Sequence, residues 1–124
     1  MKFTTTVHHG PDLLVVEGRG PALLADLFGF MDLTATIATQ GGYRRALLDL
    51  QGVEIALSFT EHLHLGAYAA RKLLDLDRVA SVVSVQNRKG TSEKAAQKMG
   101  LRFKTFTDMQ EAQAWVREEP EPAA

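Results

Sequence analysis

The chain has 124 residues, the length of a single domain, with 45% hydrophobic and 23% charged residues and a formal net charge of −1. This near-neutral balance lacks the basic excess of nucleic-acid-binding domains, so we expect no nucleic acid among the ligands. The sequence contains no Cys, which excludes disulfide bonds, Cys-zinc sites and thiol catalysis.

The N-terminus lacks the features of a signal peptide. Residues 1–7 contain neither a long apolar stretch nor a small-residue cleavage site. The rest of the sequence does not reach the roughly 18 consecutive apolar residues that a membrane-spanning helix needs. We therefore expect a soluble, cytoplasmic protein without a transmembrane segment.

The first part of the chain is predicted to form a hairpin followed by a helix. Residues 2–7 and 13–16 are rich in Thr, Val and Leu, and the turn sequence of residues 9–12 between them predicts a β-hairpin. The segment from Gly18 to Pro21 is predicted to end the second strand, with Pro21 in the first turn of a helix. Apolar residues at helical spacing predict that this helix continues to Gln40.

The remainder of the chain is predicted to alternate between strands and helices. Short apolar runs predict strands at residues 46–50, 79–85 and 103–106. Capping residues and helical spacing predict helices at residues 58–75 and 91–99 and from residue 108 onward. In the helix at 58–75, Leu63, Gly66, Ala67, Ala70, Leu73 and Leu74 are expected to share the buried face.

The order of these elements, ββαβαβαβα, predicts a single α/β domain over residues 1–117. Strands that alternate with helices imply a mixed, mainly parallel sheet with right-handed crossovers and about four helices. Residues 118–124 are acidic and Pro-rich, so they are predicted to form a disordered tail.

Two segments resemble one known family. Residues 45–54 (RALLDLQGVE) resemble the LLDL-x-GV strand and loop of anti-sigma-factor antagonist (STAS) domains. Residues 106–116 are similar to the closing F-x-D-x-x-x-A-x-x-W pattern of bacterial SpoIIAA-like (STAS/Sec14) proteins. The predicted element order agrees with this family over residues 2–117. The resemblance implies the STAS-like fold and a role as a regulator, a partner-switching module or a binder of small apolar ligands, without enzymatic activity.

The resemblance also directs attention to the start of the second helix. In phosphorylated antagonists of this family, an Asp-Ser-Ser-Gly motif begins that helix and its second Ser accepts the phosphate. Phe59 stands at that position here, so the phospho-acceptor candidates are Ser58 and Thr60. Ser58 followed by Glu61 also matches a capping box, which is a purely structural alternative for Ser58.

The loop after the strand at 79–85 is a candidate anion-binding site. Loops at the carboxyl ends of parallel strands commonly bind ligands, and cations and hydroxyl groups at a helix N-terminus suit a phosphate or carboxylate. The structural alternative is a solvated turn with Thr91 as the helix cap. The candidate residues are Arg88, Lys89, Gly90, Thr91 and Ser92.

The first helix has more apolar residues than one buried stripe needs. The excess predicts either an interface or ligand mouth, or a helix that is buried on two sides. As an interface, it would suit a second copy of the chain, a lipid-like ligand or a membrane surface, and Phe30→Ser would leave folding nearly intact. The candidate residues are Leu23, Leu27, Phe30, Met31 and Leu33.

The sequence shows no arrangement of catalytic or metal-binding residues. His62 and His64 are two positions apart, which places them on different sides of a helix, and His8 and His9 are adjacent. No nucleophile elbow is present either. We therefore expect no enzyme activity, no metal and no cofactor. Two functions remain open: a regulatory or interaction module with a protein partner, and a carrier or sensor of a small lipid-like or anionic ligand.

Overall fold

Five strands form one mixed sheet with four α-helices in the computed structural model, which describes residues 2–118. The strands are β1 (Thr4–His9), β2 (Leu14–Ala22), β3 (Arg45–Ile55), β4 (Arg78–Val82) and β5 (Phe103–Phe106). The helices are α1 (Leu24–Gly41), α2 (Phe59–Leu73), α3 (Thr91–Lys98) and α4 (Met109–Arg117), and a short 3₁₀ helix spans Val85–Asn87. The predicted element order is confirmed. The predicted disordered tail lies outside the described residues, apart from Glu118.

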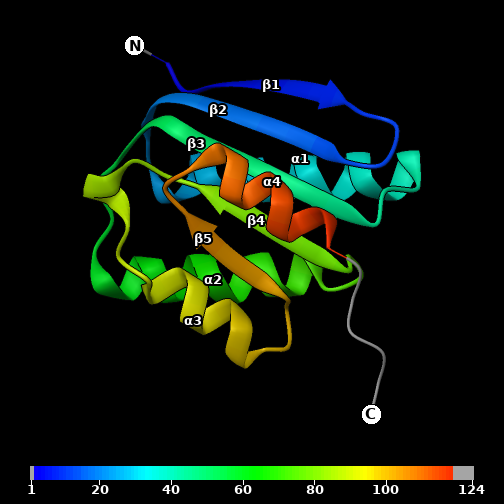
Figure 1. Cartoon of the computed structure of the whole chain (residues 1–124). Coiled ribbons are helices and arrows are strands. Elements are labelled where there is room, and N and C mark those ends of the chain that lie inside the picture. The colour runs from blue at the N-terminus through cyan, green and yellow to red at the C-terminus, as the bar shows by residue number, and fades with distance from the viewer. Residues whose placement is uncertain (1, 119–124) are drawn as a thin grey trace.

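The strands lie in the sheet in the order in which they follow one another along the chain. β1 pairs with β2 in the antiparallel sense, and β2, β3, β4 and β5 pair in parallel. Figure 1 shows α4 on one face of the sheet and α1, α2 and α3 on the other. The mixed, mainly parallel sheet is therefore as predicted.

Two hydrophobic cores follow from the alternation of side chains along the strands. Leu48 and Leu50 of β3 contribute to the larger core, which lies beneath α1, α2 and α3. Leu47, directly before Leu48 in the sequence, belongs to the smaller core together with Ala112 and Val116 of α4. Because both faces of the central strands are covered, residues 46–48 of β3 and 79–82 of β4 are all buried.

The predicted end of the second strand was wrong. β2 continues through Gly18 and Pro21 to Ala22, and α1 begins only at Leu24. The reason is non-local: β3 also extends to Ile55 and pairs with this part of β2. β1 pairs with β2 only as far as Arg19, so the proline lies beyond the last residue of β2 that pairs with β1. Strand β4, by contrast, is shorter than predicted and ends at Val82.

Candidate functional site

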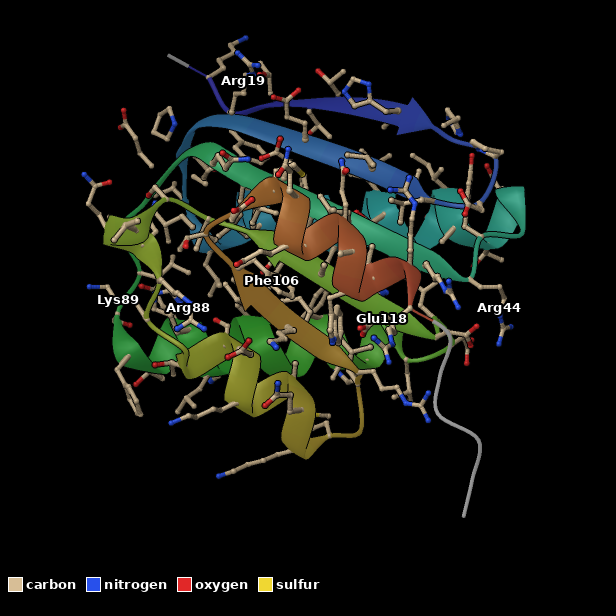
Figure 2. All side chains as sticks on the ribbon, in the orientation of Figure 1. Arg19, Arg44, Arg88, Lys89, Phe106 and Glu118 are labelled. Atoms are coloured by element: carbon tan, nitrogen blue, oxygen red, sulfur yellow. The ribbon has the colours of Figure 1, made fainter. Side chains whose placement is uncertain are left out.

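The N-terminal ends of α2 and α3 meet at the carboxyl edge of the parallel strands. β3 leads into α2 at Ser58, and β4 leads through the 3₁₀ helix into α3 at Gly90. Figure 2 shows Arg88 and Lys89 at this end of the molecule, opposite the end where Arg44 and Glu118 lie. This is the edge of an open α/β sheet where ligands commonly bind.

Gly66 allows α2 and α3 to pack closely together. A Cβ atom at Gly66 would overlap the Ser92 carbonyl oxygen and would lie 2.7 Å from the Cβ of Ala95. Only a residue without a side chain fits there, so Gly66 sets the distance between the two helices. The surfaces on either side of this contact form a cavity and a groove.

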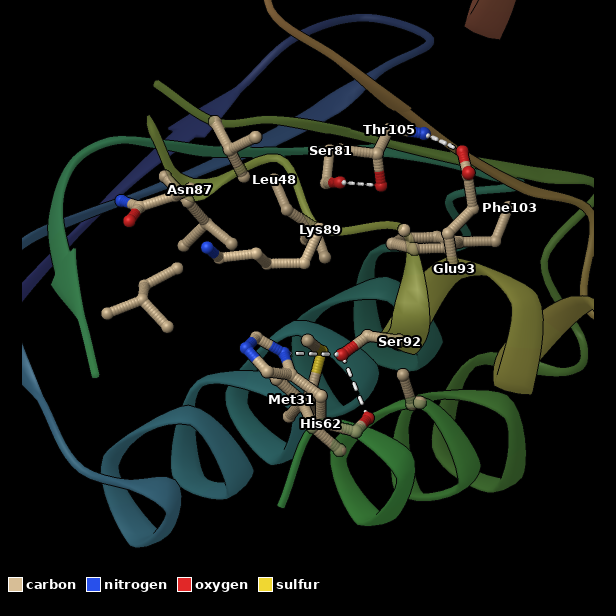
Figure 3. A pocket seen from close by; sticks show the side chains of 17 residues that line it. Met31, Leu48, His62, Ser81, Asn87, Lys89, Ser92, Glu93, Phe103 and Thr105 are labelled. Carbon is tan, nitrogen blue, oxygen red and sulfur yellow. Dashed lines mark hydrogen bonds between the residues drawn. The ribbon is translucent and has the colours of Figure 1, made fainter. Parts of the chain in front are cut away.

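The cavity has a volume of about 60 Å³ and lies between the sheet, α2 and the start of α3 (Figure 3). Its walls are mostly apolar, with polar groups near the loop that precedes α3. The side chains and backbone that line it come from Met31, Leu48, Leu50, Ile55, His62, Leu65, Gly66, Ala69, Ser81, Val83, Asn87, Lys89, Gly90, Ser92, Glu93, Phe103 and Thr105.

Most polar groups on the sheet side of the cavity are already hydrogen-bonded. The Ser81 and Thr105 hydroxyl oxygens lie 2.9 Å apart, and the Glu93 carboxylate accepts a hydrogen bond of 2.6 Å from the Thr105 amide. Asn87 donates from Nδ2 to the Val53 carbonyl oxygen at 3.0 Å. These contacts fix the loop and α3 against β3 and β5.

His62 is held against α3 by Ser92. The Ser92 hydroxyl donates to the His62 carbonyl oxygen at 2.9 Å and lies 3.1 Å from the imidazole Nδ1. Since the hydroxyl proton is used in the first bond, Nδ1 is the donor in the second, and Nε2 of the neutral ring is left unprotonated. Burial lowers the pKa of His62 below its usual value, and the Lys89 ammonium lowers it further, against an opposing effect of Glu61.

The loop candidates for anion binding have different environments. Arg88 donates to the Thr105 carbonyl oxygen at 3.4 Å, Lys89 lies at the cavity, and Ser92 contacts His62. Gly90, in a left-handed conformation with φ of 79°, is the N-cap of α3, so the structural alternative of a Thr91 cap was wrong. Among the described residues, no side chain caps α3.

A groove on the outer side of the helix contact, which we call the α2–α3 groove, has a volume of about 470 Å³. Phe59, Leu63 and Met99 contribute exposed apolar surface, with 69%, 38% and 45% of each residue exposed. Lysine residues 89, 94 and 98 also line it, together with Ala67, Gly90, Thr91 and Ala95.

The phospho-acceptor candidates are both exposed at the start of α2. Ser58 forms the predicted capping box: its hydroxyl accepts from the Glu61 amide at 3.1 Å, and Glu61 accepts from the Ser58 amide at 2.9 Å. Thr60 lies in the first turn. Phe59, between them, lines the α2–α3 groove.

The predicted apolar patch on α1 is largely a core face. Leu27, Phe30 and Met31 are 0%, 1% and 3% exposed, so only Leu23 at 74% and Leu33 at 37% present surface. Phe30 packs edge-to-face on Phe3, with 6.1 Å between ring centroids, and Met31 lines the cavity. The wide apolar stripe exists because α1 packs on both the sheet and α2. Phe30→Ser is therefore expected to damage the core rather than a surface.

Three features of the site were not predicted from the sequence. Leu63 was expected on the buried face of α2, yet Leu65 is buried there and Leu63 borders the groove. The roles of His62 and Glu93 in the cavity wall were also not predicted. Gly66 in the middle of a helix was the one available signal, since a glycine there often marks close packing.

Within residues 2–118, each helix is too short or too polar to cross a membrane. In the same part of the chain, His, Asp and Glu side chains do not form a group of three that could hold a metal ion.

Comparison with known proteins defines the fold. No protein-family model matches the sequence, and no curated protein is significantly similar to it. The chain is structurally similar to an anti-sigma factor antagonist from Mycobacterium paratuberculosis, with a TM-score of 0.66, 16% sequence identity and coverage of 94% of this chain and 96% of that one. A second similar structure is an uncharacterized protein with a SpoIIAA-like fold from Shewanella loihica, with a TM-score of 0.55, 18% identity and coverage of 92% and 93%. The chain therefore has the SpoIIAA-like, or STAS-like, fold that the sequence resemblance implied.

Proposed function

We propose that this chain is a non-enzymatic regulatory module that binds a protein partner in the α2–α3 groove. The observation that carries the proposal is the exposure of Phe59: 69% of this large apolar residue faces solvent, beside Leu63 and Met99. A cluster of exposed apolar side chains bordered by polar ones is typical of an interaction surface. An aromatic side chain at the centre of such a surface commonly contributes much of the binding energy.

The charges around the groove favour an acidic amphipathic helix as the bound segment. Lys94 and Lys98 are four residues apart on α3, and Lys89 lies in the loop before that helix. None of the three forms an ion pair within residues 2–118, and the residues that line the groove include no Asp or Glu. A partner helix with an apolar stripe and flanking carboxylates would match both features.

The likeness to an anti-sigma factor antagonist supports a protein as the partner. That protein, as its name states, acts against another protein, and it shares its fold with this chain over nearly the whole length. Control by phosphorylation would act at Ser58 or Thr60, on either side of Phe59. A phosphate there would repel an acidic partner helix and weaken docking.

The experiment is affinity capture from cells that naturally produce this chain, with quantitative mass spectrometry. Phe59→Ser is compared with the wild type and with Leu23→Ser, a control that changes a similarly exposed residue at the start of α1. We expect the wild type and Leu23→Ser to recover one protein in equal amounts, and Phe59→Ser to recover on the order of tenfold less of it. Recovery of that protein should also fall with added salt. A synthetic peptide from its acidic amphipathic segment should then bind the purified chain. Equal recovery by Phe59→Ser and the wild type would refute the proposal.

A second candidate function, the binding of a small ligand, is favoured by the apolar cavity beneath Lys89. An apolar pocket with a few convergent polar groups is the usual form of a small-molecule site. This function does not exclude the first, because the cavity and the α2–α3 groove lie on different sides of the contact at Gly66 and share only Lys89 and Gly90 among their described lining residues.

A further inference from the structure

We propose that the cavity binds a short aliphatic monocarboxylate, with its hydrocarbon end against the sheet and its carboxylate between Lys89 and His62. This inference names a ligand class for the second candidate function, and it does not depend on the α2–α3 groove being a docking surface. It is based on the size of the cavity, the character of its walls and the charges at its opening.

The size of the cavity selects a short hydrocarbon chain. Its volume of about 60 Å³ exceeds the roughly 10–15 Å³ that one water molecule requires and is below the roughly 150 Å³ of a cavity that holds benzene. An aliphatic chain of about two to four carbon atoms fits between these limits. A long fatty acid or an aromatic ring does not fit without a rearrangement.

The deep walls of the cavity are apolar. Leu48 and Leu50 of β3, Leu65 of α2 and Val83 after β4 are buried, and each borders the cavity. The polar groups on the sheet side, Ser81 and Thr105, are hydrogen-bonded to each other. A hydrocarbon chain in this space therefore leaves those two hydroxyl groups paired.

The opening of the cavity carries an unpaired positive charge. Lys89 forms no ion pair within residues 2–118, and Figure 3 shows its side chain together with His62 on the side of the cavity away from Glu93. Among the described residues that line the cavity, Glu93 is the one acidic residue, and it accepts a hydrogen bond from the Thr105 amide on the β5 side. The ammonium group of Lys89 is therefore available to a ligand carboxylate.

His62 gives the site a response to pH. Its Nδ1 is hydrogen-bonded to Ser92, so Nε2 takes up the proton when the ring becomes charged. The charged groups around the ring are Lys89 in the loop, Glu61 on α2 and Glu93 on α3. A bound carboxylate favours the protonated ring, so binding takes up a proton and becomes tighter as the pH falls through the titration of His62.

The test is calorimetric titration of the full chain with acetate, propionate, butyrate and octanoate. We expect the affinity to rise about fourfold for each methylene group as far as butyrate and to fall for octanoate. Binding of butyrate should strengthen as the pH falls below 6.5, the range in which the lowered pKa of His62 lies. Lys89→Ala should weaken it on the order of tenfold, whereas Lys98→Ala, which removes a lysine from the groove only, should leave it unchanged.

Several results would overturn the proposal. Equal binding of butyrate and inorganic phosphate would show that the hydrocarbon chain is not recognised. Equal binding of butyrate and 1-butanol, or wild-type affinity in Lys89→Ala, would show that the carboxylate is not recognised. Circular dichroism of each variant separates loss of binding from loss of folding, which is not expected at the exposed Lys89. Failure of butyrate to bind would leave partner capture through Phe59 unaffected, so the two proposals fail separately.

Discussion

Gly66→Ala is expected to destabilise the protein by forcing α2 and α3 apart. In an open helix position this change is favourable by about 0.8–1.0 kcal/mol, because alanine has a higher helix propensity than glycine. At Gly66, however, the new methyl group would overlap the Ser92 carbonyl oxygen and approach the Ala95 Cβ to 2.7 Å. The backbone oxygen and the Cβ atom cannot rotate away, so the relief must come from a shift of α3.

The structure allows an estimate of the size of this effect. Overpacking of a close contact costs about 1–3 kcal/mol. The clash at Gly66 involves a backbone oxygen, so we take the upper part of this range, about 2–3 kcal/mol, of which the propensity gain offsets about 1 kcal/mol. We therefore expect a net loss of about 1–2 kcal/mol, which in a domain of this length lowers Tm by about 4–10 °C. Because α3 moves, the cavity and the α2–α3 groove should change as well, so Gly66→Ala should also weaken butyrate binding.

Gly29→Ala is the matched control. Gly29 is also inside a helix, α1, but a Cβ atom there would meet nothing within 4 Å. This variant should be more stable than the wild type by about 0.4–1 kcal/mol. The assay is urea unfolding followed by circular dichroism, with the midpoint and slope of each variant compared with those of the wild type. Equal effects of the two substitutions would refute the assignment of Gly66 as the residue that sets the helix separation.

Two further predictions concern the core and the cavity wall. Phe30→Ala should lower the free energy of unfolding by about 3–5 kcal/mol in urea, because Phe30 is 1% exposed. Leu33→Ala, at a partly exposed position of the same helix, should cost much less. A small effect of Phe30→Ala would contradict the burial of Phe30. Because the pKa of His62 is lowered in the folded protein, the unfolded chain binds a proton at this residue more tightly than the folded chain does. The free energy of unfolding should therefore rise with pH between the lowered folded pKa and the unfolded value of 6.5. His62→Asn should reduce the loss of stability between about pH 7.5 and about pH 5, and an unchanged pH profile in this variant would contradict the assigned environment.

The order of the elements could be predicted because its signals are local. The capping residues Ser58 and Asp108 start α2 and α4 as expected, and their side chains accept the predicted backbone hydrogen bonds. The alternation of apolar runs with helical spacing was sufficient for the mainly parallel sheet. These features depend on neighbours within about one helical turn.

The lengths of β2 and β3 could not be predicted because they depend on pairing between distant segments. Gly18 and Pro21 are typical of a turn, yet the parallel pairing of β2 with β3 continues past both. A register shift between Glu17 and Arg19 accommodates the change in direction. Local composition cannot report this pairing, since the partner residues lie more than 30 positions away in the sequence.

The site was predicted in part. The loop with Lys89 and Ser92 does lie at the carboxyl edge of the sheet, and both residues border the cavity. The exposed faces of the helices were misassigned, because α1 packs on α2 as well as on the sheet, and α2 packs on α3. Phe30 is buried for this reason, and Leu63 borders the groove rather than the core, since helical spacing alone does not show where the neighbours of a helix lie.

The most direct test of partner docking in the α2–α3 groove is site-specific photocross-linking in the cells that produce the protein. A benzoylphenylalanine residue is introduced at position 99 in the groove and, as a control, at position 23 on α1. We predict one cross-linked protein that forms from position 99 and not from position 23, with the attachment point in an acidic amphipathic segment of that protein. Absence of a product from position 99, an equal product from position 23, or attachment to a basic segment would contradict it.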